Sequence, residues 1–321
     1  MVNTKVTYAA CYPGQGAQKP KMALDLYEQS SGVRNLFEIA SDAVGKNLFN
    51  VLDTADEASL QQTELTQVVV TLANRSAATV LQERGLQFAC HAGFSLGELS
   101  AYAATGVLTE ESLFSIVAKR GELMAQATEA AMKRYGQLAM AAIVGVGFST
   151  VERVLSEQKA RMLYCANDNS PTQVVISGLA SEIERCSEAL KQSGARRIIP
   201  LKVSGPFHTP LMQDAAAEFA EFLQNFTFSD PKAPLYVTVS GTQVYTGNDV
   251  REQCIKQLSS PVRWTRILQD ISETKGVTRA LEIGPGTTLS GFWKASGIPI
   301  NCTSVGTYEE IRSVSEEEGN G

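Results

Sequence analysis

The chain of 321 residues is 44% hydrophobic and 19% charged, which excludes an intrinsically disordered protein and suffices for one large or two smaller domains. Its net charge of −6 offers no general basic field, so neither nucleic acid nor a membrane is expected as a partner. No apolar run reaches the roughly 18 residues of a membrane span, and no signal-peptide pattern opens the chain. The six cysteines lack metal-binding spacing, so we expect reduced thiols in a cytoplasmic protein without a metal site.

The first part of the chain alternates strand and helix patterns. We predict a strand at residues 6–12, a tight turn at 13–16 and a helical region that extends to about residue 83. A second strand is expected at 86–93, followed by helices at 96–104 and 109–132. Thr109 is expected to cap the last of these helices, with Glu110 and Glu111 in its first turn.

The middle of the chain has the order strand, helix, strand, strand, helix, strand. The corresponding ranges are 138–146, 149–158, 162–166, 173–177, 181–194 and 197–203. Ser149 to Glu152 reads as a capping box, and a polar turn is expected between the second and third strands. This order is that of a ferredoxin-like unit, so we predict an inserted α+β subdomain at residues 135–204.

The flanking segments, residues 1–134 and 205–321, are predicted to form one large hydrolase-like α/β body with a parallel sheet and helices. After the insertion we expect a helix at 210–226, a strand at 235–239 and helices at 250–258 and 265–274. A last strand is expected at 278–283, and a helical segment follows Gly284-Pro285-Gly286. The polar tail 316–321 is expected to be frayed.

Ser95 lies between Gly93 and Gly97, where the second predicted strand gives way to a helix. Strand, glycine-flanked turn and helix with a serine at the apex is the layout of a nucleophile elbow, although GxSxG also occurs as a plain turn. In an elbow the backbone N–H of Leu96 is free to stabilise an oxyanion. A serine hydroxyl is a weak nucleophile and needs a base within reach.

The chain contains two histidines, and His208 is the better placed base. His91 lies four residues before Ser95 inside the incoming strand and is expected to point away from the apex. His208 precedes Thr209, a predicted N-cap, and Pro210, a predicted first helical residue. The positive end of a helix dipole favours the neutral imidazole that a general base requires. The alternative is a loop histidine that fills a gap.

Arg120 interrupts the apolar face of the long helix. Leu113, Val117, Arg120, Met124 and Ala127 follow one another at spacings of 4, 3, 4 and 3 residues, which places them on one helix face. A buried guanidinium stays charged and requires an anion. That anion is either a structural carboxylate, which spacing alone favours slightly, or a carboxylate on a bound substrate.

Two glycine turns are weaker signals. Gly14-Gln15-Gly16 and Gly284-Pro285-Gly286 both follow predicted strands and could present N–H groups to an anion. Neither has P-loop spacing, and each taken alone is more often a simple turn.

Seven short motifs occur in order along the chain: Tyr12–Gln18, Gln62–Gln67, Gly93–Glu98, Lys119–Met124, Gly205–Met212, Gln257–Trp264 and Glu282–Gly286. With these motifs, residues 5–306 resemble the malonyl-CoA:acyl carrier protein transacylases, the enzymes that load malonyl groups for fatty acid synthesis. The resemblance implies a ping-pong acyl transfer in which malonyl-CoA is the donor. The acceptor is then the phosphopantetheine thiol of acyl carrier protein, and no cofactor takes part.

The resemblance also implies roles for individual residues. Ser95 would be the nucleophile and His208 its base, with oxyanion donors on the backbone of Gln15 and Leu96. Arg120 would pair with the malonyl carboxylate, which revises the preference from spacing alone.

Three further positions match the family. Gln67 matches a glutamine near the site, and Gln257 matches one close to the histidine. Phe207, directly before His208, is the pairing of malonyl-selective members, so methylmalonyl should be disfavoured.

The sequence departs from the family at one position, because Phe94 stands where many members have a histidine before the serine. Members with phenylalanine there exist, so we expect activity to be retained. Acyl carrier protein is usually acidic, so we also predict a local basic patch at the site mouth, with Lys202 and Arg263 as candidates, and a monomeric chain.

Three alternative functions make different demands on these residues. A trans-acting acyltransferase of a polyketide synthase would carry nearly the same residues. A serine esterase or other hydrolase would have no use for Arg120 on an apolar face. A noncatalytic binding module is disfavoured because Ser95 and His208 would then have no reason to coexist with Gln15 and Arg120.

Overall fold

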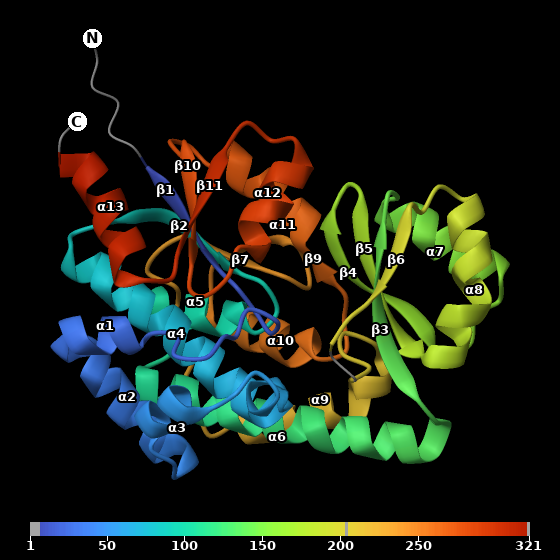
Figure 1. Ribbon diagram of the computed structural model, residues 1–321, viewed down its shortest axis with the longest axis horizontal. Helices are drawn as coiled ribbons and strands as arrows, with labels where there is room; N and C mark the ends of the chain where they lie inside the picture. Colours follow the sequence, from blue (N-terminus) through green and yellow to red (C-terminus); the bar gives the residue numbers. More distant parts are fainter. Residues whose placement is uncertain (1–6, 203–204, 320–321) are drawn as a thin grey trace.

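The computed structural model of the chain describes residues 7–202 and 205–319. Two sheets organise these residues, with strand orders β11-β10-β1-β2-β7-β8 and β6-β3-β5-β4-β9. Figure 1 shows the six-stranded sheet among most of the helices and the smaller sheet at the right, with the long helix α6 running along the lower side toward β3. The α/β fold class predicted from the sequence is confirmed, as is the order of elements in the inserted unit.

The six-stranded sheet is parallel except for its last pair, β7 and β8. Its strands are β1 (Tyr8–Tyr12), β2 (Phe88–Gly93), β7 (Leu235–Val237), β8 (Thr242–Val244), β10 (Arg279–Ile283) and β11 (Asn301–Val305). Successive residues of β1 enter two different cores: Ala10 and Tyr12 face one, Ala9 and Cys11 the other. A parallel strand covered on both faces needs this continuous apolar run.

Helices and two 3₁₀ turns surround this sheet. They are α1 (Leu24–Gln29), α2 (Ser31–Val44), α3 (Leu48–Thr54), η1 (Ser59–Gln61), α4 (Thr63–Glu83), α5 (Gly97–Ala104), α6 (Glu110–Tyr135), η2 (Pro210–Met212), α9 (Gln213–Leu223), α10 (Gly247–Gln257), α11 (Trp264–Glu273), α12 (Thr288–Ser296) and α13 (Tyr308–Gly319). The predicted cap of α6 is confirmed, since the Thr109 side chain accepts a hydrogen bond from the N–H of Ser112.

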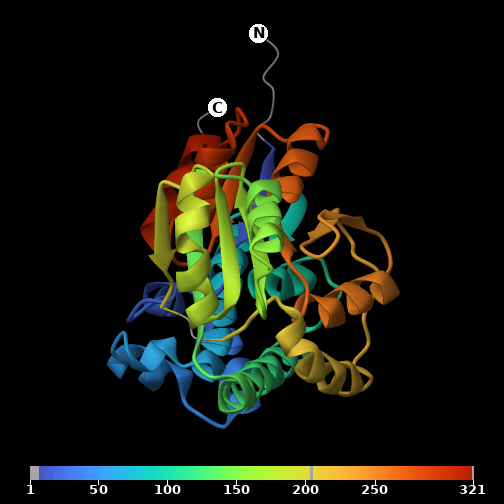
Figure 2. The same cartoon turned by 90° about the vertical axis from the view of Figure 1, so that its right-hand side faces the viewer.

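The inserted unit contributes most of the smaller sheet. Its elements are β3 (Leu138–Val144), α7 (Phe148–Glu157), β4 (Leu163–Ser170), β5 (Gln173–Leu179), α8 (Ala180–Gln192), β6 (Arg197–Pro200) and, from the body, β9 (Val262–Arg263). The unit's own strands are antiparallel with the first and third in the centre, which is the ferredoxin-like arrangement. Figure 2 shows α7 and α8 on the outward face of this sheet. The domain limits 1–134, 135–204 and 205–321 stay predictions.

Two local predictions in this unit were wrong. The capping box at Ser149 to Glu152 does not form, because α7 begins at Phe148 and its N-cap is Gly147, without a side-chain cap. Phe148, the first residue of the helix, packs against the small unit's core. The polar turn before β5 is also shorter than predicted. β4 continues through Asn167 and Asp168, because these residues pair with β5 on one side and with β9 on the other.

Further differences concern the ends of elements. The helix expected at 210–226 is a 3₁₀ turn followed by α9, which ends at Leu223. The short strands β8, β9 and β11 were not predicted. The tail expected to be frayed from residue 316 is helical to Gly319. Val6, Val203 and residues 320–321, which several predictions included, lie outside the described residues.

All six cysteines are free thiols, five of them buried and Cys302 half-buried. Within residues 7–202 and 205–319, no helix is long and apolar enough to cross a membrane.

Candidate active site

The turn from β2 into α5 is a nucleophile elbow. Ser95 has a φ of +52°, a left-handed backbone conformation that is uncommon for a residue with a side chain. A Cβ atom on Gly93 would overlap the Gly97 carbonyl group, and a Cβ on Gly97 would overlap the Tyr12 carbonyl oxygen. Both glycines of the motif are therefore required by close backbone approach, and together they hold the serine at the apex.

Two backbone amides beside Ser95 are open. Neither the N–H of Gln15 nor that of Leu96 donates a hydrogen bond to any residue in the described part of the chain. The Gln15 loop lies against the elbow, since a Cβ on Gly14 would overlap the Phe94 carbonyl oxygen. Two free N–H donors next to a serine are suited to stabilising an oxyanion.

His208 contacts the serine directly. Its Nε2 lies 2.7 Å from Ser95 Oγ, and its Nδ1 lies 2.9 Å from the backbone oxygen of Gln257. A carbonyl oxygen only accepts, so Nδ1 carries the proton and the Nε2 lone pair faces the serine hydroxyl. Burial and the nearby Arg120 charge lower the pKa of His208 to about 4, so the imidazole is neutral at neutral pH.

Arg120 is fully buried on α6. Its Nη1 donates to the side-chain oxygen of Gln67, and its Nη2 donates to Gln257 Oε1 at 2.9 Å. Among the described residues no carboxylate forms an ion pair with this guanidinium, and its Nε has no acceptor. The structural carboxylate considered from helix spacing is therefore not found there, and the cation faces two neutral amide oxygens.

Gln257, at the end of α10, connects the two halves of this network. Its Oε1 accepts from Arg120, its Nε2 donates to the backbone oxygen of Ser95 at 3.1 Å, and its own backbone oxygen holds His208. On the other side of Arg120, Gln67 Nε2 donates to Gln15 Oε1 at 3.3 Å. Side chains from five separate chain segments thus form one continuous hydrogen-bonded set around the serine.

A cavity of about 540 Å³ opens onto Ser95 and His208 between the large body and the inserted unit. Its walls include Phe207 and Lys202, which were singled out from the sequence. The inserted unit and the body both contribute further lining residues, among them Met140, Ala142, Asn167, Asn169, Gln173, Val175 from the one and Gln15, Phe94, Met124, Thr288, Phe292 from the other. Arg120, Gln67 and Gln257 are not lining residues, but Gln67 and Gln257 form hydrogen bonds to Gln15 and Ser95, which are.

The remaining sequence candidates are placed differently. Arg263 stacks its guanidinium 4.7 Å from the centre of the Phe148 ring and lines a neighbouring cavity of about 280 Å³, which His208 also borders. Phe94 contacts Trp264 edge-on, with ring centres 5.6 Å apart, so an apolar ring suits this position. The His91 ring is buried and contacts the Tyr12 hydroxyl rather than Ser95. Burial lowers the pKa of His91 to about 3.

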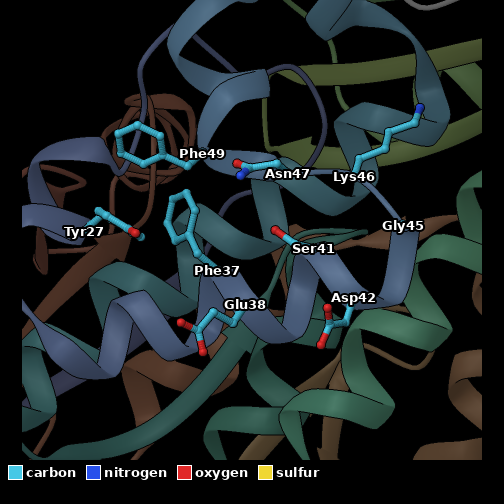
Figure 3. A pocket seen from close by; sticks show the side chains of 9 residues that line it. All are labelled: Tyr27, Phe37, Glu38, Ser41, Asp42, Gly45, Lys46, Asn47 and Phe49. Carbon is cyan, nitrogen blue, oxygen red and sulfur yellow. The ribbon is translucent and has the colours of Figure 1, made fainter.

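A separate cavity of about 630 Å³ lies where α1, α2 and α3 meet (Figure 3). The Tyr27 ring packs against the rings of Phe37 and Phe49, and all three line the cavity. The Ser41 hydroxyl there accepts a hydrogen bond from the N–H of Leu48, and no histidine or cysteine lines the cavity. This cavity therefore has no nucleophile and base pair of the kind found at Ser95.

Sequence reasoning missed one buried group beside the site. Glu98 is the last residue of the motif Gly93–Glu98, yet the sequence analysis predicts no role for it. Its side chain is fully buried on α5, close to Arg120 and Gln257. An acidic residue in the first turn of a buried, mostly apolar helix was the available signal.

The elbow, the paired histidine and the two open amides define a serine acyltransferase or hydrolase site on an α/β fold. The acyl transferase domain family matches residues 10–308, and the chain belongs to this family. It is therefore an acyltransferase, and the resemblance found in the sequence is confirmed.

Individual relatives agree with this assignment. The malonyl CoA-acyl carrier protein transacylase of Bacillus subtilis is 35% identical, with 97% of this chain and 98% of the relative covered. The structure is similar to that of an acyl carrier protein S-malonyltransferase from Vibrio cholerae, at 34% identity and a TM-score of 0.90, over 96% and 99% of the two chains. A malonyl-transacylase in complex with its type II polyketide synthase acyl-carrier protein matches at 33% identity and a TM-score of 0.90, over 97% and 99%.

Proposed function

We propose that the chain transfers the malonyl group of malonyl-CoA to the phosphopantetheine thiol of acyl carrier protein, through a malonyl ester of Ser95, and so supplies fatty acid synthesis. The observation that carries this proposal is the 2.7 Å contact between Ser95 Oγ and a His208 Nε2 whose lone pair faces the hydroxyl. The names of the relatives support the choice of donor and acceptor.

In the first half of the proposed reaction, Ser95 Oγ attacks the thioester carbonyl while His208 Nε2 takes the hydroxyl proton. The N–H groups of Gln15 and Leu96 hold the oxyanion. Collapse of the tetrahedral intermediate breaks the carbon–sulfur bond, and His208 returns its proton to the departing CoA sulfur. The malonyl group is then an ester on Ser95.

In the second half, the phosphopantetheine thiol enters the same cavity and gives its proton to His208 as its sulfur attacks the ester. The carbon–oxygen bond to Ser95 breaks, and the proton returns to Oγ. These steps draw only on side chains and backbone amides of this chain. The proposed mechanism therefore includes neither a metal nor a cofactor.

Selection of the acyl group is assigned to Arg120, Gln67 and Phe207. A malonyl carboxylate reaching the guanidinium would replace the neutral amide oxygens with a charge-assisted contact. Acetyl-CoA brings no carboxylate, so the buried cation stays without an ion-pair partner and acetyl should be a poor donor. Phe207 narrows the cavity beside His208 and should disfavour the methyl branch of methylmalonyl.

Recognition of an acidic carrier protein is proposed for the rim of the cavity. Lys202 is exposed and lines that cavity, whereas Arg263 is half-buried and is expected to contribute less. The side chains of Arg196 and Arg197, at the start of β6, are also exposed. Arg197 begins β6, the edge strand of the smaller sheet, and Lys202 follows the end of that strand.

The intact mass of the protein after mixing with malonyl-CoA tests the proposal, with acetyl-CoA in a parallel sample and no acceptor present. We expect one malonyl adduct, little acetyl adduct, and no adduct with Ser95→Ala. Release of CoA without an adduct would indicate a hydrolase. Neither adduct nor CoA release would exclude malonyl-CoA as the donor.

A further inference from the structure

Glu98 is a fully buried carboxylate that the proposed reaction steps do not use. Its Oε2 accepts the N–H of Thr238 at 2.6 Å, and its Oε1 accepts the hydroxyl of Tyr102. A buried charge requires such partners, and burial raises the pKa of this carboxyl group nevertheless. This costly group lies three residues after the nucleophile, in the first turn of the helix that follows the elbow.

The neighbours of Glu98 are the groups assigned to acyl selection. Burial raises the pKa of Glu98, and the nearby Gln257 amide opposes that shift. Burial lowers the pKa of Arg120 to about 10, and the nearby Glu98 carboxylate opposes that shift in turn. Within the described residues, however, Glu98 and Arg120 form no ion pair. The two carboxylate oxygens instead accept hydrogen bonds from Thr238 and Tyr102.

The orientation of Gln257 depends on such a charge. Its Oε1 must face Arg120 and its Nε2 must face the backbone oxygen of Ser95 for both observed hydrogen bonds to form. The flipped amide would set an NH₂ group against the guanidinium and an oxygen toward Ser95 and Glu98. A carboxylate only accepts hydrogen bonds, so the Glu98 charge disfavours that flipped state.

We propose that Glu98 is a positioning residue for donor selection. Held by Thr238 and Tyr102, it fixes the Gln257 amide and thereby the Arg120 guanidinium in the arrangement that receives a carboxylate-bearing acyl group. This inference rests on the proposed malonyl transfer, and it concerns the choice of donor rather than the chemistry at Ser95.

The test compares single-turnover acylation by malonyl-CoA and acetyl-CoA in the wild type and Glu98→Gln. The variant keeps the side-chain shape and an acceptor for Thr238, but it loses the charge. We expect malonyl acylation to fall about 10-fold, the effect of one poorly made hydrogen bond to a charged group, and acetyl acylation to change less than about 2-fold. In an Arg120→Ala background, Glu98→Gln should leave the donor ratio unchanged, because the two residues act as one unit.

Glu282→Gln is the matched control. Glu282 is also fully buried, and its carboxylate accepts the N–H groups of Leu289 and Ser290, each at 2.9 Å. None of its hydrogen bonds in the described part of the chain involves Arg120 or Gln257, so its loss should lower the melting temperature without changing the donor ratio.

If Glu98→Gln slows acylation by both donors equally, Glu98 is a structural residue and the inference is overturned. The inference is also overturned if the variant slows acylation by neither donor. If Glu98→Gln does not fold, Tyr102→Phe replaces it. That variant frees one carboxylate oxygen to approach Arg120, so the donor ratio should again fall, and an unchanged ratio would overturn the inference. If the wild type forms no malonyl adduct, the proposed function itself is refuted. If the wild type prefers malonyl-CoA and the variant has the same donor ratio, only the inference about Glu98 is refuted.

Discussion

Ser95 and His208, the two groups proposed to exchange a proton, both have left-handed backbone conformations, with φ of +52° and +60°. Such a conformation costs a residue with a side chain about 1 kcal/mol or more, so the surrounding structure must impose it. For Ser95 the constraint is the contact between glycines and neighbouring backbone. For His208 it is the hydrogen bond from its N–H to the Leu258 oxygen together with the bond from its ring to Gln257.

The low pKa of His208 leads to a prediction for the acid side of the reaction. Because the base must be neutral, acylation by acetyl-CoA should be constant near neutral pH and half-maximal near pH 4, the pKa of His208. Single-turnover acylation over this range measures the midpoint, and acetyl-CoA is used because it has no titrating carboxylate.

Arg120→Ala provides the control, since the Arg120 charge is one cause of the low pKa. The midpoint should move to higher pH in this variant. An unmoved midpoint would mean that the titrating group is not the buried imidazole beside Arg120.

At this scale, sequence reasoning predicted the reacting pair and, through the family resemblance, a glutamine close to the histidine, but not the hydrogen bonds that connect them. Ser95 and His208 stand out because each occupies a turn with a specific local pattern. Gln257 and Glu98 have no such pattern. Their partners Ser95, Arg120 and Thr238 are distant in the chain, and only the folded structure shows that one amide joins the nucleophile to the guanidinium.

At the scale of elements, the close packing of α4 on α6 positions the guanidinium network. Gly121 makes this approach possible, because a Cβ there would lie 3.0 Å from Glu64 Cα and 3.2 Å from Gln67 Cγ. The glycine next to Arg120 therefore sets how near Gln67 comes to the guanidinium.

Gly121→Ala should separate the two helices slightly and displace Gln67 from Arg120. We expect a loss of about 1–3 kcal/mol of stability, typical of overpacking, and a lower preference for malonyl over acetyl. Denaturant unfolding and the donor ratio are the measurements. Gly291→Ala on α12, where a Cβ meets no atom within 4 Å, should instead be neutral or slightly stabilising. Equal effects in both variants would contradict the packing argument.

The elements that escaped prediction are short or depend on distant pairing. β9 has two residues and exists because it pairs with β4, while β11 is an edge strand with exposed and half-buried residues. Asn167 and Asp168 read as a turn, yet they lie in a strand because partners stand on both sides, and Thr265 Oγ1 donates to Asp168 Oδ1 at 2.8 Å. By contrast, β1 was predictable from its continuous apolar run, and α6 from the helical spacing of its apolar residues.

For the whole molecule, the arrangement of two sheets determines how the site opens. The cavity lies between the body that carries Ser95 and the inserted unit, and β9 joins the two by pairing with β4. With the cavity at this boundary, the large body holds the nucleophile, and the inserted unit forms the opposite wall of the cavity that the acyl group enters.

The two histidines, both buried and neutral, link the stability of the whole molecule to pH. Their pKa values are about 3 for His91 and about 4 for His208 in the folded chain, against the ordinary value of 6.5 that each regains on unfolding. Between these values the unfolded chain binds protons that the folded chain does not, so acid favours unfolding. Each histidine therefore contributes stability that is present above about pH 6.5 and is lost as the pH falls through its folded pKa.

His91→Gln isolates one of these contributions, because an amide oxygen can still accept the Tyr12 hydroxyl but does not titrate. The raised pKa of Glu98 acts in the opposite sense in both proteins and cancels in the comparison. As the pH falls from neutral to about 4, the melting temperature of the wild type should therefore fall more steeply than that of the variant. Parallel curves would show that His91 is already charged in the folded chain, and the neutral, buried assignment of this residue would then be wrong.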